Sequence, residues 1–333
     1  MRIICWVFCI YFDSSRSIDG GGEMASFVLR RFISMVITLW LIVTVTFFLM
    51  HTIPGSPFQR DGRESNETVI QNLMAHYHLD QPLGVQYVLY LKSLVGLDLG
   101  PSISHYPDTV NNMIARGFPV SFQLGMAALL FAIVSGIALG TVAALRHNKI
   151  IDYAAMVFAV IGIAVPNFIV ATVLIKYVAV EWKLFPVASW GTWKHIVLPA
   201  LALATGPLAL IARMTRANMI EVLNQDYIET AKAKGLSPAV IVCKHALRNA
   251  VLPVVTLLGA LLANVLTGSF VIEKIFAVPG MGKYFVDGIN NRDYAVIMGT
   301  TVFYSALLVF LMFLVDVAYG IIDPRIKLHK REG

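Results

Sequence analysis

"DYIETAKAKGLSP", residues 226–238, is a charged stretch that lies between two long apolar runs of the chain. Two acidic and two basic side chains crowd into it, whereas only 14% of the whole chain is charged and 57% is hydrophobic. Charged side chains stay in water unless they are paired, because burying an isolated charge costs several kcal/mol or more. The stretch therefore predicts a protein whose fold is divided between an apolar environment and an exposed polar connection.

The same stretch predicts two short helices joined by a tight turn. Residues 219–234 are expected to form one helix with an apolar face at helical spacing, made of Ile220, Leu223, Tyr227 and Ala231. Gly235 is the residue type that ends helices, because it adopts a left-handed backbone without strain. Ser237 then stands at an N-cap and Pro238 at the first position of a second helix, residues 239–249. This pattern favours a docking element; a solvated connecting loop is the alternative.

Composition places the rest of the chain in a bilayer. A mean hydropathy of +0.72 over 333 residues is too apolar for a soluble globular domain. Lipid cannot hydrogen-bond the backbone, so apolar segments of about 20 residues are expected to be helices. The fold class predicted is an all-α membrane protein with six transmembrane helices, at residues 32–50, 120–145, 153–180, 196–211, 250–272 and 295–322.

The positive charges orient these segments. If the first helix starts inside, the inner connections hold 14 Lys and Arg residues and the longer outer ones hold 9. Both termini are then cytoplasmic, the charged stretch is cytoplasmic, and residues 52–119 lie outside. Residues 66–78 and 83–94 of that outer segment are expected to be amphipathic helices of a small folded cap; a disordered linker is the alternative.

Residues 1–23 do not fit the pattern of the following chain. Their apolar core is shorter than a span, and no small-residue cleavage site follows it, so a signal peptide is disfavoured. The run from Gly20 to Glu23 would be encoded by purine-rich codons like those of a ribosome-binding site. We expect translation to start at Met24; a short cytoplasmic extension is the alternative.

From Met24 onward, the chain resembles the B-type permease subunits of dipeptide and oligopeptide ABC transporters. The residues from Glu229 to Gly235, "ETAKAKG", resemble the EAA-x3-G motif of importer permeases, with Thr230 in place of an alanine. The usual I-x-L-P is displaced, since "HALR" stands there and Leu252-Pro253 follows later. Other matching stretches are "HTIPGSPF" (51–58), "LDLGPS" (97–102), "HALRNAVLPVVT" (245–256), "EKIFAVPGMGKYF" (273–285), "RDYAVIMG" (292–299) and "VDVAYGIIDPRI" (315–326).

The resemblance implies the type I ABC importer permease fold and a division of the chain into parts. Residues 24–118 would hold the first transmembrane helix and an extracytoplasmic cap, residues 119–325 the permease core, and residues 326–333 a basic cytoplasmic tail. Within the core, residues 217–249 would form the segment that couples the permease to an ATPase. The coupling residues implied are Glu229, Thr230, Ala231, Gly235, Leu236 and Ser237.

The resemblance also implies partners and a location. The chain would be a pore-forming subunit of a peptide importer in a bacterial cytoplasmic membrane, surrounded by lipid and without nucleic acid. Two ATPase subunits would hold ATP and magnesium, so that this chain is not an enzyme and binds no cofactor. A second, C-type permease subunit and an extracytoplasmic peptide-binding protein would complete the transporter.

Nickel is the alternative cargo, because nickel permeases resemble the same family. His51, His76, His78 and His105 fall on the expected outer side, and imidazole is a ligand for soft divalent metals. However, positions i and i+2 of a helix face different ways, so that His76 and His78 would not both face one ion. Surface histidines are the favoured interpretation, and no metal site is predicted.

Polar groups within the apolar segments are candidates for the transport pathway. Asn264, Thr267 and Ser269 lie on the fifth segment and are the candidate pore-lining residues. Lys176 and Asp316 lie near the ends of spans, where snorkelling or helix pairing accounts for them.

A nucleotide-binding loop and a membrane enzyme are the remaining interpretations. "PGMGKY", residues 279–284, resembles a P-loop, but Ala277 stands where that loop needs glycine and Tyr284 where it needs Ser or Thr. The sequence contains no HExxH, no GxSxG and no carboxylate pair within the spans. Neither alternative is supported.

Overall fold

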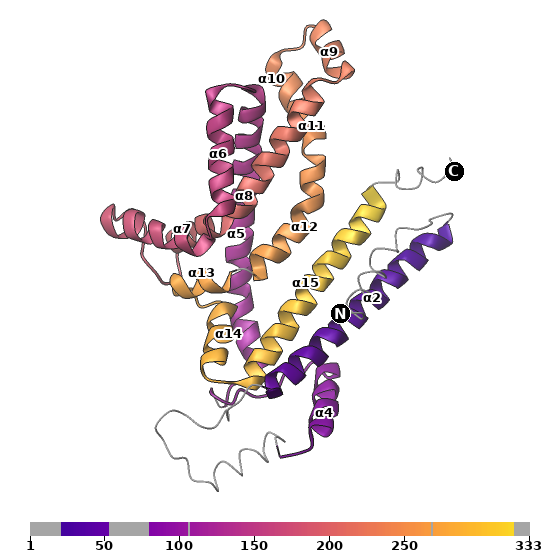
Figure 1. The fold of residues 1–333 in the computed structure, drawn as a ribbon, viewed down its shortest axis with the longest axis vertical. Helices are drawn as coiled ribbons and strands as arrows, with labels where there is room; N and C mark the ends of the chain where they lie inside the picture. Colours follow the sequence, from indigo (N-terminus) through magenta and orange to yellow (C-terminus); the bar gives the residue numbers. More distant parts are fainter. Residues whose placement is uncertain (1–20, 53–79, 106, 268, 323–333) are drawn as a thin grey trace. The chain divides into compact units, whose positions relative to one another are not determined.

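The computed structural model describes residues 21–52, 80–105, 107–267 and 269–322, and within these ranges the backbone is almost entirely helical (Figure 1). A single pair of residues, Pro101 and Thr109, forms an isolated antiparallel bridge there. The expected helix at residues 66–78, most of residues 1–23 and the basic tail at 326–333 lie outside the described residues.

Within the described ranges, four helices are long and apolar enough to cross a membrane. Two are the whole helices α5 (Val110–Leu145) and α8 (Trp193–Leu223). The other two are Val28–Thr52, which is part of α2 (Gly21–Thr52), and Tyr294–Val315, which is part of α15 (Tyr294–Ile322). Two bent pairs of helices also pass as single spans, which brings the total to six within the described part of the chain. The expectation of a multi-pass, all-α membrane protein is confirmed.

The third expected span, residues 153–180, is not straight. It consists of α6 (Ile150–Ala164), α7 (Asn167–Leu174) and the π-helix η1 (Ile175–Glu181), and the chain bends by 105° between α6 and α7. Val165 is extended and Pro166 caps α7, because a residue before proline is pushed out of the helical region. Since 15 residues of helix are only about 22 Å long, α6 is shorter than the apolar layer of a bilayer.

The fifth expected span, residues 250–272, is also interrupted. It corresponds to α12 (Leu252–Thr267), which bends by 52° against the helical segment Pro238–Ala250, and to α13 (Phe270–Ile275). The second expected span, residues 120–145, is by contrast continuous and begins about ten residues earlier than expected, since α5 starts at Val110 and continues through Pro119. The positions of the apolar stretches were thus predicted correctly, but the breaks within the third and fifth of them were not predicted.

One compact unit combines described residues from both parts of the chain, those before residue 116 and those after residue 283. In it α2 and α15 run side by side (Figure 1). Phe47 of α2 packs with Tyr294 and Ile297 of α15, and α4 (Leu83–Val95) joins this cluster through Tyr87 and Tyr90. The expected helix at 83–94 is confirmed. This unit crosses the division expected at residue 118, because α15 packs on α2.

Two motifs that are far apart in the sequence meet in this unit. Asp293, which is fully buried, accepts hydrogen bonds from the hydroxyls of Ser102 (2.6 Å) and Ser104 (2.8 Å). Its other oxygen accepts from the amide of Val296 (3.2 Å) and so caps the start of α15. The "LDLGPS" and "RDYAVIMG" stretches therefore form one structural element.

The second unit, residues 116–283, is built around α8. α6, α7 and α12 all pack on this helix, and its inner face is rich in alanine. Gly136 and Gly140, one helical turn apart on α5, lie directly against α8, where a β-carbon would collide with Ile211, the Leu208 carbonyl and the Ala212 carbonyl. Small residues at this spacing let two membrane helices approach closely.

Candidate functional site

The charged stretch forms a helical element that projects from the end of α8. α8 ends at Leu223, α9 (Asp226–Ala233) follows, and α10 (Pro238–Val240), η2 (Ile241–Ala246) and α11 (Leu247–Ala250) lead back toward α12 (Figure 1). The prediction of a single helix at residues 219–234 is wrong, because the helix is interrupted at Asn224 and Gln225. This break lets α9 fold back on its neighbours instead of extending α8 into solvent.

The turn after α9 is built on Gly235. Its φ of +74° is left-handed, as predicted. Its amide donates to the carbonyl of Lys232 (2.9 Å), and the amide of Leu236 donates to the carbonyl of Ala231 (3.3 Å). These two bonds are the Schellman pattern that closes a helix C-terminus. A β-carbon at Gly235 would meet nothing within 4 Å, so the glycine faces open space.

The inner face of this element is a small apolar core. Ile228 and Ala231 of α9 are buried against Met219 of α8, Ile241 and Ala246 of η2. Of the apolar face predicted from the sequence, Ala231 is buried and Ile220 and Leu223 pack against this core, but Ile228 takes the place of Tyr227, which is 41% exposed. The hydroxyl of Tyr227 instead accepts a hydrogen bond from the Asn249 amide (2.8 Å), which ties α9 to α11.

The outer face carries most of the residues expected to contact a partner. Glu229, Thr230, Gly235, Leu236 and Ser237 are exposed, whereas Ala231 is buried and contributes to packing. Ser237 occupies the N-cap position before Pro238, but its side chain makes no capping hydrogen bond.

Two further exposed apolar side chains were not predicted as exposed, since Tyr227 was assigned to the inner apolar face and Val240 was not singled out. Tyr227 and Val240 flank Leu236 along the chain, and the three are each about two-fifths exposed. Nothing in the local pattern marks Val240 as exposed, because it lies within the apolar run of residues 239–242. The element therefore presents a mixed apolar and charged face, which is typical of a protein contact surface.

An ion pair fastens α8 to the start of α6 close to this element. The Asp152 carboxylate is buried and accepts from Arg216 of α8, with Nη2 at 2.7 Å from Oδ2 and Nε on Oδ1. The same carboxylate accepts from the backbone amide of Asn148 (3.0 Å) in the turn between α5 and α6. A bidentate pair of this kind fixes orientation as well as distance. Sequence reasoning did not single out either residue.

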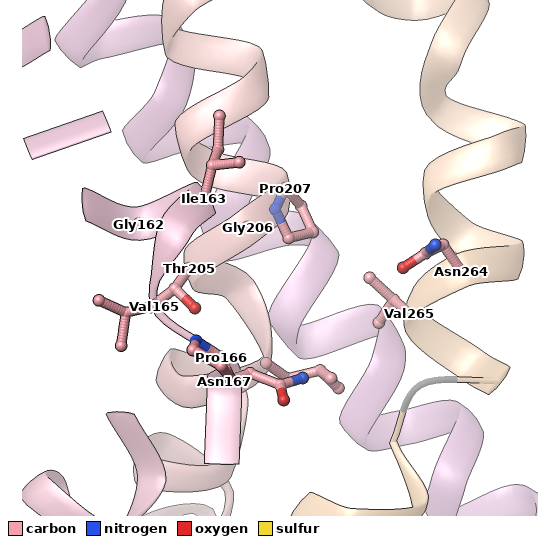
Figure 2. A pocket seen from close by; sticks show the side chains of 11 residues that line it. Gly162, Ile163, Val165, Pro166, Asn167, Thr205, Gly206, Pro207, Asn264 and Val265 are labelled. Carbon is pink, nitrogen blue, oxygen red and sulfur yellow. The ribbon is translucent and has the colours of Figure 1, made fainter. Parts of the chain in front are cut away.

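A cavity of about 180 Å³ lies deeper in the same unit. It forms where α6 breaks into α7 and faces Gly206 and Pro207 of α8 and Asn264 of α12 (Figure 2). Asn264, a candidate pore-lining residue, therefore borders a cavity. The side chain of Thr267 lies outside the described residues.

Ser269 has a structural role. Its side chain is fully buried and donates to Glu273 of α13 (2.6 Å). The second oxygen of Glu273 accepts from the amide of Gly282 (2.7 Å), and Ser121 accepts from the amide of Met281 (2.8 Å). The amides of the "PGMG" loop are thus bonded within the chain, which agrees with the exclusion of a phosphate-binding loop.

The described histidines of the expected outer side have protein partners. The ring of His51 contacts the carbonyl of Phe47 (2.8 Å) and the amide oxygen of Gln86 (3.0 Å). His105 lies 3.5 Å from the hydroxyl of Ser102, and residues 53–79, which include His76 and His78, lie outside the described residues. Among the described residues, no cluster of three or more His, Cys, Asp or Glu side chains could hold a metal ion.

Comparisons with known proteins agree with the helical architecture. Solved structures of the MetNI methionine ABC transporter, inward facing, match 63% of this chain and 96% of the compared chain, at 19% identity and a TM-score of 0.54. An amino acid ABC transporter matches 64% of this chain at 15% identity and a TM-score of 0.51. At these identities the likeness shows the fold alone, which is that of a type I ABC importer permease.

Sequence relatives are closer. The dipeptide transport system permease protein DppB of Bacillus subtilis is 62% identical over 308 residues, which is 92% of this chain and all of the relative. The oligopeptide transport system permease protein OppB of Haemophilus influenzae is 44% identical over 91% of this chain. Residues 24–124 match the N-terminal part, and residues 136–328 the main part, of one family. The chain therefore belongs to the family of binding-protein-dependent transport system inner membrane components.

Proposed function

We propose that this chain is the pore-forming permease subunit of an ATP-driven importer for dipeptides and oligopeptides. The observation that carries the proposal is the exposed element from Asp226 to Ala250, which has its own apolar core and an outward face of mixed character. The 62% identical relative is named a dipeptide permease, and this identity supports peptides as the cargo. No specific observation favours nickel.

The chain would depend on partner subunits for energy and for delivery of cargo. One of the two ATPases would bind the exposed side of this element, which includes Glu229, Leu236 and Ser237, and closure of the two ATPases would move the element as a body. Only the two residues Asn224 and Gln225 separate α8 from this element, so that movement of the element would reach the membrane helices that pack on α8. A second permease subunit would complete the pore, and a peptide-binding protein would deliver cargo from outside.

The proposal is tested by reconstitution of the complete transporter in proteoliposomes. Labelled dialanine, a longer peptide and nickel are offered with the binding protein outside and ATP inside. Uptake of either peptide that depends on ATP supports the proposal. Uptake of nickel alone, or of no cargo by a fully assembled complex, would overturn it.

The orientation is tested separately with the exposed Cys243, which lies on η2 of the charged element. This cysteine is expected to resist a membrane-impermeant maleimide in sealed cells and to react after the cells are opened. A cysteine introduced at the exposed position Val95 is the matched control for the outer side. Labelling of Cys243 in sealed cells would reverse the proposed orientation.

A further inference from the structure

The cavity in the second unit is lined by polar side chains but by no ionisable ones. Its polar side chains are Asn167, Thr205 and Asn264, and none of the 11 side chains that line it is ionisable. In Figure 2 the side chain of Asn264 extends from α12 toward the side of the cavity where Thr205 and Pro207 lie. A site of this kind suits a polar but uncharged group, because a charge would enter without a counter-charge.

The backbone around the cavity adds both donors and acceptors. α6 ends at Ala164, so the carbonyls of its last turn, including Gly162 and Ile163, have no partner within the helix. α7 begins at Asn167, and the amides of Asn167 and Phe168 likewise lack helical acceptors, whereas those of Ile169 and Val170 donate to the Pro166 carbonyl. In α8, Pro207 has no N–H to give to the carbonyl of Leu203, which also borders the cavity. Broken helices lend their backbone groups to substrates in other membrane transporters.

This set of groups matches one chemical unit. A peptide bond carries one N–H donor and one C=O acceptor and has no net charge. The cavity, at about 180 Å³, is smaller than pockets that enclose whole drug-sized ligands, which are roughly 300–1,000 Å³. It can therefore hold one segment of a peptide and leave the charged ends outside.

We infer that the cavity between Pro166, Gly206 and Asn264 is a subsite that binds the main-chain amide of a peptide during its passage. This inference rests on the proposed function and goes beyond it. A subsite that reads the peptide bond, and not a side chain, would accept peptides of many sequences. It would also discriminate against bare metal ions, because no carboxylate, imidazole or thiolate lines it.

Filling the cavity is the first test. A β-carbon at Gly206 would meet nothing within 4 Å, so the side chain of Gly206→Leu starts in open space at the lining of the cavity. The transporter with this substitution is expected to assemble and to hydrolyse ATP, while peptide uptake falls at least 10-fold. Gly84→Leu, which also faces open space but lies on α4, is the matched control and should keep normal uptake.

The second test asks whether the cavity reads the peptide bond. Dialanine is compared with alanyl-lactate, its ester analogue, which lacks the N–H. The wild-type transporter should take up the amide faster, and Asn264→Leu should narrow this amide-to-ester ratio about 3- to 10-fold, the value of one hydrogen bond. Thr256→Val on the same helix is the control. The binding protein is unchanged, so its own preference cancels when the variant is compared with the wild type.

Each outcome decides between distinct explanations. Normal uptake by Gly206→Leu would place the cavity off the pathway and overturn the inference, while peptide uptake by the wild type would still support the proposed function. Loss of the second permease subunit from purified Gly206→Leu would mean that a partner helix fills the cavity. An amide-to-ester ratio unaffected by Asn264→Leu would show that the cavity does not read the peptide bond. Absence of peptide uptake by the wild type would instead remove the proposed function itself.

Discussion

Two glycine-containing turns of the second unit are used in opposite ways. Gly235 has a left-handed backbone and open space around it. Gly282 has an ordinary backbone, and a β-carbon there would lie 2.7 Å from the Cα of Phe270 and 2.9 Å from the Glu273 carboxyl. The first glycine is needed for its backbone angle and leaves its surroundings free for another molecule. The second is needed for its small size and serves the packing of this chain alone.

The crowded turn should respond most strongly to a single methyl group. Gly282→Ala is expected to destabilise the chain by about 3 kcal/mol, the upper part of the usual range for overpacking, because the obstructing atom of Phe270 belongs to the backbone. The free energy of unfolding in detergent micelles measures this effect. A loss below about 1 kcal/mol would mean that the loop can shift, and that the close contact is not essential.

Substitution of Glu273, whose carboxyl group bonds with the turn at Gly282, should have the second-largest effect on stability. Glu273→Gln is expected to cost about 2 kcal/mol, because an amide cannot accept from both Ser269 and the Gly282 N–H with the same geometry. Glu229→Gln is the matched control, since Glu229 is exposed and should leave the free energy of unfolding unchanged. Equal stability of the two variants would contradict the assigned role of Glu273.

Substitutions at Gly235, the turn with open space around it, should reduce stability less than those at Gly282 and Glu273 and should reduce transport more. Gly235→Ala and Gly235→Trp should both cost about 1 kcal/mol, since each forces an L-residue into the left-handed region and a β-carbon there meets nothing of this chain within 4 Å. Their transport should differ, because only tryptophan fills the space that an ATPase would occupy. Peptide uptake and co-purification of the ATPase, measured on both variants, test this; equal uptake by the two would make the turn a simple connector.

A surface substitution beside the open turn should have the smallest effect on folding. Leu236→Asp removes an apolar side chain that is 38% exposed and is expected to change stability by less than about 0.5 kcal/mol. ATP hydrolysis by the assembled transporter should nevertheless become uncoupled from uptake, or the ATPase should dissociate. Val95→Asp on α4, which is also exposed, is the control and should transport normally.

The parts of the fold that depend on local sequence were predictable. Apolar length located the membrane helices, and glycine followed by Ser-Pro located the turn at residues 235–238. The break at Pro166 had a local signal as well, because a residue before proline avoids the helical region. It was missed because the apolar run continues across the proline, and hydropathy alone does not show where a helix ends.

The contacts between distant segments were not predictable from one sequence. Asp293 bonds with Ser102 and Ser104, about 190 residues earlier, and the Met281 amide bonds with Ser121, 160 residues earlier. Local spacing carries no information about such pairs. The bond between Ser269 and Glu273 is local instead, since the two residues are four positions apart, and it distinguishes Ser269 from Asn264, which borders the cavity.

The length and continuity of α8 make it a lever. Gly206, at the cavity, and Leu223, where the helix ends, are 17 residues apart on one helix, which corresponds to about 26 Å at 1.5 Å per residue. Tilting such an arm by about 10° around the cavity moves its far end by about 4–5 Å, and the reverse holds for a push at the charged element. The glycine contacts with α5 and the pair between Asp152 and Arg216 attach neighbouring helices to this arm. A displacement of a few ångströms at the Leu223 end of α8 would therefore change the tilt of this helix at the cavity. The ratio of displacement to tilt depends on how far Pro207 lies from that end.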